Sequence, residues 1–265
     1  MAEPKQVVVT VASGPHAGRL DYTFSSFARN QHLELHAFII GEKLPERRIP
    51  GISYHLRAQD PSFQDAMREL YYRRFLFIDE LGADYALIVD NSDVLCLQTL
   101  PALPQLLRGA MFAGSAEHQA GRYLLGQGYT SNYLNAGVTF WDAKKSKAAR
   151  EEIVIRGRSR FRSVDDQLTL NEVLLTGYYD QIVLLPSQYN YRAHLAPTRT
   201  RGWPTVTHLD GVVIYHNSHC VDAAKRLQPA ARADLVALTA DTAPLTPWQR
   251  TWRKIQNRIQ PHVVR

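Results

Sequence analysis

With 265 residues, the chain is long enough to bury the core of one large α/β domain. Hydrophobic residues make up 45% and charged residues 21%, the balance of an ordinary globular protein, and no apolar run approaches the ~20 residues needed to cross a bilayer. The formal charge of +6 favours anionic partners such as nucleotide phosphates or anionic lipid. No zinc-finger spacing or RNA-binding aromatic signature is present, so nucleic acid is not an expected partner.

Cysteine usage and the first residues bear on the cellular compartment. Cys96 and Cys220 lie far apart in the sequence, which predicts free structural thiols and neither a disulfide framework nor a cysteine metal site. Polar Glu3 and Lys5 precede a strand-like run, so we expect no secretory signal and a cytoplasmic location.

The first forty residues predict a strand, a helix and a second strand. Residues 6–12 form a Val-rich apolar run, residues 13–18 form a loop, and residues 21–30 have helical periodicity before a strand over 33–40. A strand, a helix and a strand in this order are typical of a parallel sheet.

A Pro-rich connection leads from this unit to a long predicted helix. The apolar residues of 64–81 recur at helical spacing, and Gly82 closes the helix. Further along, we expect strands near 110–114, 134–141, 182–185 and 212–215, a Gly- and Tyr-rich loop over 121–131, and a helix over 164–175.

Residues 86–95 combine an apolar run with acidic side chains. Leu87, Ile88 and Val89 lead directly into Asp90, and Asp93 follows closely. Carboxylates at the end of a buried strand are costly unless a cation neutralises them, and they supply the hard oxygen ligands that Mg²⁺ or Mn²⁺ prefers. Asp and Asn also end strands as ordinary turn residues, so both interpretations stand on this segment alone.

Several motifs, taken in order, resemble those of one family. They are Tyr72-Arg73-Arg74-Phe75, Leu134-Asn135-Ala136-Gly137-Val138, Asp166-Gln167 with Leu170-Asn171, Leu185-Pro186 with Tyr189-Asn190, and Ile214-Tyr215-His216. The chain resembles the retaining glycosyltransferases of family 8 from about residue 5 to about residue 220. The resemblance implies a GT-A, nucleotide-diphospho-sugar transferase fold of the α/β class, with a mixed, mainly parallel central sheet flanked by helices.

The resemblance also implies a site for Mn²⁺ or Mg²⁺ that binds the donor diphosphate. Its ligands would be Asp93, His216 and either Asp90 or Asn91, because this chain departs from the family's D-x-D pattern. Alignment without a gap selects Asn91, whereas a one-residue bulge would restore Asp90, and we favour Asp90 with Asp93. A hydrogen-bonded core histidine is the alternative for His216.

In the family, the Asp-Gln pair faces the transferred sugar. Asp166 would hold sugar hydroxyls, and Gln167 would lie beneath the anomeric carbon. An amide is a poor nucleophile, so we favour front-face departure and attack through an oxocarbenium-like state, with a covalent intermediate on Asp166 as the alternative. Without the resemblance, Asp166 would be an acidic residue that complements a helix dipole.

Donor binding is assigned by resemblance to five residues: Ala12, Arg74, Asn135, Gly137 and Lys225. Adjacent Arg73 is expected at the surface, and a glycine at 137 allows close approach of the backbone to a ligand. Lys225 stands in for a lysine that the family carries sooner after its His, and His219 or an arginine is the alternative. The loop after the first strand lacks the acidic residue that contacts uracil and ribose in the family, although UDP remains the expected base.

Basic segments complete the chain. The arginines over 156–162 and 192–201 could close over the diphosphate, bind an acidic acceptor or form a solvated basic surface. Residues 246–260 predict a basic amphipathic helix with Trp248 and Trp252 on one face, which would lie at the inner face of an anionic membrane or pack on the domain. We therefore expect a catalytic domain over 1–225 and a tail over 226–265.

The sequence as a whole predicts a metal-dependent retaining glycosyltransferase of the hexosyltransferase type. It would move a sugar from a nucleotide-diphosphate donor, with UDP the default, to a saccharide or another hydroxyl acceptor. A non-catalytic module that binds sugar nucleotides or glycans is the main alternative. A nucleotidyltransferase is less favoured, because no Gly-rich loop with a lysine follows the first strand.

Overall fold

The computed structural model describes residues 3–14, 17, 20, 24–91, 94–116, 133–159, 166–191 and 211–216. The strands are β1 (Gln6–Ser13), β2 (Glu34–Ile40), β3 (Ile52–Arg57), β4 (Tyr85–Val89), β5 (Val94–Cys96), β6 (Phe112–Ala116), β7 (Leu134–Asp142), β8 (Ile182–Leu185) and β9 (Ile214–His216). The helices are η2 (Phe24–Arg29), α2 (Ala66–Arg73), α3 (Phe77–Glu80), α4 (Leu103–Leu107), α6 (Lys147–Ser159), α7 (Asp166–Gly177), η3 (Tyr179–Gln181) and η4 (Ser187–Tyr189).

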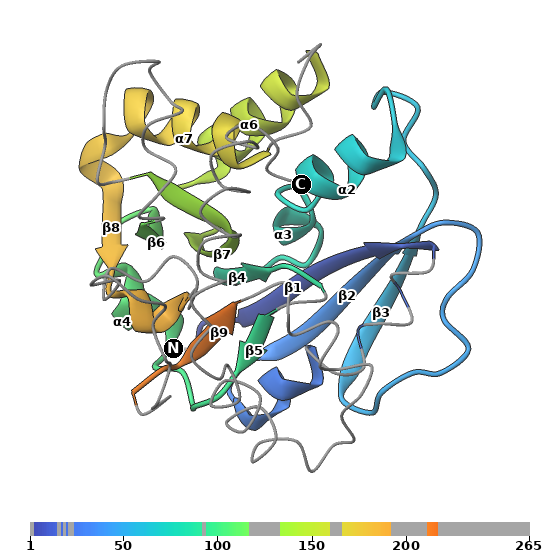
Figure 1. Cartoon of the computed structure of the whole chain (residues 1–265), viewed down its shortest axis with the longest axis horizontal. Helices are drawn as coiled ribbons and strands as arrows, with labels where there is room; N and C mark the ends of the chain where they lie inside the picture. Colours follow the sequence, from blue (N-terminus) through green and yellow to red (C-terminus); the bar gives the residue numbers. More distant parts are fainter. Residues whose placement is uncertain are drawn as a thin grey trace, which may run out of the picture.

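A seven-stranded sheet forms the centre of the described fold, with the strand order β3-β2-β1-β4-β7-β6-β8 (Figure 1). β1 pairs in parallel with both β2 and β4, whereas β7 runs antiparallel to β4 and β6. β5 and β9 form a separate antiparallel pair. The expected mixed, mainly parallel sheet flanked by helices is thus confirmed.

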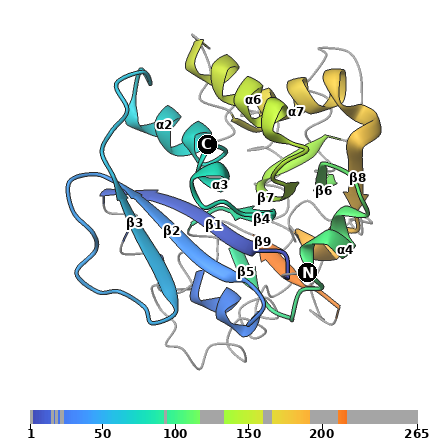
Figure 2. The same cartoon turned by 180° about the vertical axis from the view of Figure 1, so that it is seen from behind.

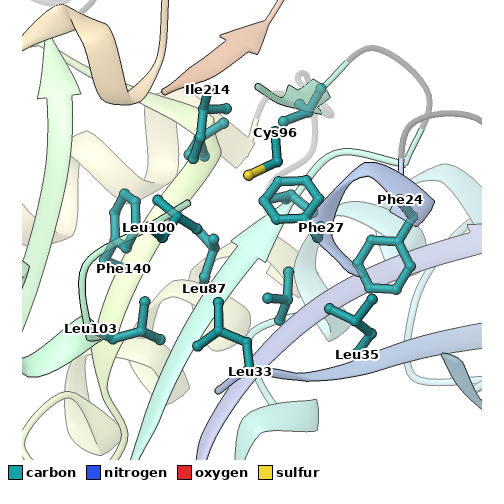
Figure 3. Close-up of a cluster of buried hydrophobic side chains, with 14 of the residues drawn as sticks. Phe24, Phe27, Leu33, Leu35, Leu87, Cys96, Leu100, Leu103, Phe140 and Ile214 are labelled. Carbon is teal, nitrogen blue, oxygen red and sulfur yellow. The ribbon is translucent and has the colours of Figure 1, made fainter. Parts of the chain in front are cut away.

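Apolar side chains cover both faces of this sheet, as the nearly continuous Val and Ile runs of its parallel strands predict. On one face, Val7, Val9 and Ile88 pack under α2, α3, α6 and α7, and Figure 2 shows these helices together on that side. On the other face, Leu87 and Phe140 meet residues from η2, β5 and β9 (Figure 3). The sheet is therefore enclosed on both sides and holds its strand ends in fixed positions.

The single helix predicted over 64–81 is wrong, because the structure divides it into α2 and α3. A fully buried guanidinium causes the break: Nη1 of Arg150 donates to the carbonyl of Phe75 at 2.6 Å. In a continuous helix that carbonyl would accept from the N–H of Asp79, which instead donates to Leu76 at 3.1 Å. The carboxylate of Asp79 in turn binds Arg150 through two hydrogen bonds.

Other differences from the predicted elements are smaller. β3 lies in the segment expected to be a connection, and α6 was not predicted, because Arg150 interrupts its apolar face. Residues 24–29 form a 3₁₀ helix within the segment expected to be helical. Cys96 is buried with a free thiol, as expected. Residues 217–265, including Cys220 and the amphipathic tail, lie outside the described residues.

None of the helices in the described ranges is both long and apolar enough to cross a bilayer.

Gly157 in α6 provides a test of how the helices over the sheet pack. A Cβ at this position would lie 2.5 Å from Cγ of Tyr72 and closer still to two other ring atoms. Tyr72 is fully buried, and its hydroxyl is 2.8 Å from Oγ1 of Thr169 in α7. This residue therefore links α2, α6 and α7.

We predict that Gly157→Ala lowers the free energy of unfolding by about 1–3 kcal/mol, because the added methyl overpacks this contact. Gly177→Ala in α7 is the matched control, since a Cβ there meets nothing within 4 Å. Chemical denaturation of both variants measures the difference. Equal stability of the two variants would contradict the packing described here.

Candidate functional site

The strand order of the sheet by itself indicates where a ligand would bind. The chain runs outward from β1 through β2 to β3 and then returns to the other side of β1 as β4. In open α/β sheets, ligands bind outside the carboxyl ends of strands at such a reversal. Asp90 directly follows β4 at this position, and Nδ2 of Asn91 donates to the carbonyl of Val11 in β1 at 2.9 Å.

Asp90 follows β4 at the end of a regular ladder, and the bulge considered between Asp90 and Asp93 falls partly on residues outside the described ranges. β4 pairs with β7 in an unbroken register from Tyr85 to Val89, and the N–H of Asp90 continues the ladder by donating to the carbonyl of Gly137 at 2.9 Å. A Cβ on Gly137 would lie 2.5 Å from Oδ2 of Asp90 and closer still to Cε1 of His216. Gly137 thus leaves room for the side chains of Asp90 and His216.

Arg74 joins the two acidic residues of the site. Its Nη1 donates to Oδ1 of Asp90 at 2.6 Å, and its Nη2 donates to the carbonyl of Ala136 at 2.9 Å and to Oδ2 of Asp166. The side chain is 4% exposed. Burial by itself lowers the pKa of Arg74, but the carboxylates of Asp166 and Asp90 more than offset this effect, so the pKa lies above its ordinary value.

The pairing of Arg74 with Asp90 and Asp166 leaves an electrostatic imbalance. One buried guanidinium faces two carboxylates, so these three side chains carry one net negative charge. An uncompensated charge in a desolvated site favours binding of a cation. Adjacent Arg73 points elsewhere and binds Glu69 and the carbonyl of Ala58, as a residue outside the site would.

Asp166 and Gln167 come from the first turn of α7, which Asn171 attaches to β7. Oδ1 of Asn171 accepts from the N–H of Leu134 at 2.6 Å, and its Nδ2 donates to the carbonyls of Leu134 and Gln167. Oε1 of Gln167 in turn accepts from Nδ2 of Asn135 at 2.9 Å and from the N–H of Ala136 at 3.2 Å. The carboxamide of Gln167 is therefore held in one orientation against β7.

His216 ends β9, and its ring faces the carboxylate of Asp90. Nε2 of His216 lies 3.6 Å from Oδ2 of Asp90, and Nδ1 lies 2.9 Å from Oδ1 of Asn190. β5 places this strand, because Val94 pairs with His216. The side chain is 3% exposed, so a hydrogen-bonded core histidine is part of what is observed.

A carboxylate oxygen and an imidazole nitrogen that face each other can both bind a divalent metal ion. The described ranges contain no cluster of three or more His, Cys, Asp or Glu side chains with metal-binding geometry. Asp93, the expected third ligand, lies outside the described residues, although Val94, which follows it, pairs with His216. The residues present fit the implied metal as part of its ligand set.

The remaining predicted residues divide between the site and its surroundings. Asn135 and Gly137 lie in β7 against Gln167, Asp90 and His216. Ala12 is fully buried in β1. Lys225, His219 and residues 192–201 lie outside the described residues. Arg156 pairs with Glu152, and Arg158 pairs with Asp60 and stacks on Phe63.

Sequence reasoning missed the structural part that Asn190 and Asn171 take in the site. Both belong to motifs that were recognised, but neither received a role. Their signal was a polar side chain at a buried position, which requires a hydrogen-bond partner, and the partner could not be identified before the chain was folded.

Comparison with solved structures identifies the fold. The chain is similar to the bifunctional glycosyltransferase WbbM, with a TM-score of 0.56 and 14% identity. The alignment covers 96% of this chain and 52% of WbbM. GlyE of Streptococcus pneumoniae TIGR4 (TM-score 0.56, 17% identity) is covered over 64% by 96% of this chain. The galactosyltransferase LgtC, solved with donor and acceptor sugar analogues (TM-score 0.51, 18% identity), is covered over 99% by 92% of this chain.

The chain therefore has the GT-A-like fold of these glycosyltransferases, as the sequence predicts. It spans about half the length of WbbM and about two thirds of GlyE. No protein-family model matches the chain, and no curated protein matches it.

We predict that Arg74→Met lowers the free energy of unfolding by about 3–5 kcal/mol at pH 7, because it leaves the buried Asp166 and the half-buried Asp90 without their counter-ion. Arg156→Met is the control, since it breaks an exposed Arg–Glu pair and should cost less than about 1 kcal/mol. Chemical denaturation of the metal-free protein measures both. A loss for Arg74→Met no larger than that for the control would show that the charge cluster contributes nothing to stability.

Proposed function

We propose that the protein is a metal-dependent retaining glycosyltransferase that uses a nucleotide-diphosphate sugar, with UDP as the expected base. The observation that carries the proposal is the pairing of Asp90 and His216 at the carboxyl end of β4, beside Asp166 and Gln167. The glycosyltransferase fold supports it, as does the structure of LgtC with donor and acceptor sugar analogues. A second structure of LgtC is described as an active-site mutant in which a Gln is replaced by Glu.

In this proposal, Asp90, His216 and Asp93 would hold a divalent metal, which would supply positive charge to neutralise a departing diphosphate. Oδ1 of Asp90 is already bound to Arg74, so Oδ2, which faces His216, is the oxygen available for the metal. Arg74 holds Asp90, a proposed metal ligand, and Asp166, proposed to hold sugar hydroxyls, in fixed positions relative to each other.

The environments of Asp166 and Gln167 favour front-face transfer over a covalent intermediate. The carboxylate of Asp166 is paired with Arg74, which lowers its nucleophilicity. Oε1 of Gln167 already accepts two hydrogen bonds from β7. The bond between the anomeric carbon and the diphosphate oxygen breaks, the acceptor hydroxyl attacks the same face, and its proton passes to the departing phosphate oxygen.

Donor binding provides the first test. A ligand that binds only the folded state raises the midpoint of thermal unfolding. We expect Mn²⁺ with one member of a panel of UDP-, GDP-, CMP- and dTDP-sugars to raise the midpoint of the wild-type protein, whereas Asp90→Asn should lose most of the shift. NMR of the product formed from that donor should show retention of the anomeric configuration.

Each result of the donor test has a defined meaning. Metal-dependent binding without release of nucleotide diphosphate, with any acceptor or with water, would support a binding module instead. An inverted product would exclude the retaining mechanism. No shift with any donor, for a folded protein with metal present, would exclude the proposed donor class.

We further predict that Gly137→Ala weakens Mn²⁺ binding at least tenfold, because its Cβ would occupy the space of the Asp90 carboxylate and the His216 ring. Isothermal titration of the metal-free protein with Mn²⁺ measures this effect. Gly177→Ala, which adds the same methyl in open space, should bind Mn²⁺ as the wild type does. Unchanged affinity in Gly137→Ala would remove Asp90 and His216 from the metal site.

A further inference from the structure

A chain of side-chain amides connects the backbone of β7 to the ring of His216. The N–H of Gly137 donates to Oδ1 of Asn135 at 3.0 Å. The same oxygen lies 2.9 Å from Nδ2 of Asn190, and Oδ1 of Asn190 lies 2.9 Å from Nδ1 of His216. Asn135, Asn190 and His216 are each about 95% buried or more, so bulk water competes little for these bonds.

The backbone determines the direction of each hydrogen bond in this series of side-chain amides. A backbone N–H can only donate, so the atom of Asn135 that faces Gly137 is its oxygen. That oxygen accepts, which means that Asn190 presents its NH₂ group to Asn135. The remaining atom of Asn190 is its carbonyl oxygen, and it accepts from Nδ1–H of His216.

A second backbone group requires the same orientation of Asn135. The N–H of Ala136 donates to Oε1 of Gln167, which identifies that atom as the oxygen. Oε1 also accepts from Asn135, so Nδ2 of Asn135 points toward Gln167 and Oδ1 points toward Gly137 and Asn190. The backbone N–H groups of Gly137 and Ala136 therefore require the same orientation of the Asn135 side chain. Reversing the side-chain amide of Asn135 or of Gln167 would lose hydrogen bonds.

The proton on Nδ1 determines the state of Nε2, the other nitrogen of the His216 ring. In a neutral imidazole only one nitrogen carries hydrogen, so a proton on Nδ1 leaves the lone pair on Nε2. Nε2 is the atom that lies 3.6 Å from Oδ2 of Asp90. In the opposite tautomer, Nε2–H would point at the carboxylate and pair with it, which would occupy both groups.

Backbone hydrogen bonds keep Asn190 and His216 in register. The N–H of His216 donates to the carbonyl of Tyr191 at 3.0 Å, and the N–H of Tyr191 donates to the carbonyl of Ile214 at 2.8 Å. The N–H of Val213 donates to the carbonyl of Gln188 at 2.9 Å. The segment that carries Asn190 is thus attached to residues 213–216 on both sides of Asn190.

We propose that Asn190 is a positioning residue that holds His216 in the Nδ1–H tautomer and so directs the Nε2 lone pair toward the metal. This inference rests on the proposed function, because the metal is the group that would use the lone pair. Mutation of a residue that hydrogen-bonds to a metal-binding histidine typically lowers the metal affinity 10–100-fold. The same series of hydrogen bonds orients Gln167, because Asn135 bonds to both Gln167 and Asn190. Asn190 therefore also couples the proposed metal ligand His216 to the residue proposed to lie beneath the sugar.

The test compares Asn190→Leu with Asn190→Asp. Leucine removes both hydrogen bonds at similar volume, whereas aspartate keeps an acceptor for Nδ1–H. Nitrogen-15 NMR of the metal-free protein at a pH where the histidines are neutral reports the tautomer, and the spectrum of His216→Gln assigns the signal. We expect Nδ1–H in the wild type and in Asn190→Asp, and Nε2–H or a mixture in Asn190→Leu.

Titration with Mn²⁺ alone supplies the second measurement. We expect Asn190→Leu to bind Mn²⁺ about 10–100-fold more weakly than the wild type, and Asn190→Asp to remain within a few-fold of it. Asn30→Leu controls for the loss of a buried amide, because Asn30 bonds to Phe27, Cys96 and Leu100 and not to His216. It should alter neither the tautomer nor the affinity for Mn²⁺.

The outcomes separate this inference from the proposed function. An Nε2–H tautomer in the wild type, or Nδ1–H retained in Asn190→Leu, would overturn the assignment to Asn190. A wild-type Nδ1–H tautomer that Asn190→Leu loses, together with no binding of Mn²⁺ by the wild type, would overturn the proposed metal function while the tautomer assignment stands.

Discussion

The buried guanidinium of Arg74 is the interaction on which the candidate site depends. It joins Asp90 at the end of β4, the backbone of β7 and Asp166 at the start of α7, which are otherwise separate parts of the fold. Without it, the buried carboxylate of Asp166 and the half-buried carboxylate of Asp90 would repel each other with no counter-ion. Arg74 compensates only one of the two negative charges, so it ties these parts together and leaves the excess negative charge on which the proposed metal site rests.

Around this charge cluster, backbone geometry decides where each group points. The antiparallel pairing of β4 with β7 puts Gly137 opposite Asp90, and the missing side chain gives the space that Asp90 and His216 share. The N–H groups of Gly137 and Ala136 orient Asn135 and Gln167, and through Asn190 they orient the ring of His216. One strand therefore positions the proposed metal ligands and the sugar-facing amide together.

Two arginines show how the same residue type can act in different ways. Arg150 is fully buried, and it binds the carbonyl of Phe75 and the carboxylate of Asp79, which ends one helix and begins another. That break places Arg74 at the end of α2, where its side chain faces the site. Arg156, in an exposed pair with Glu152, has no comparable effect on the fold. Burial, which removes competition from water, separates a structural arginine from a surface one.

The sequence by itself determined the sheet class and most strands and proposed several candidate site residues, because hydrophobic periodicity and motif order are local properties that survive without knowledge of contacts. It predicted Asp90, Arg74, Asp166, Gln167 and His216, but it left Asn91 as an alternative ligand and gave no role to Asn190. It also joined α2 and α3 into one helix. Only the tertiary structure supplied the partners of Asn190 and Phe75, since each is distant in sequence: Asn135 and His216 for Asn190, and Arg150 for Phe75. Hydrogen bonds between such residues form only when strands and helices meet, so no local pattern records them.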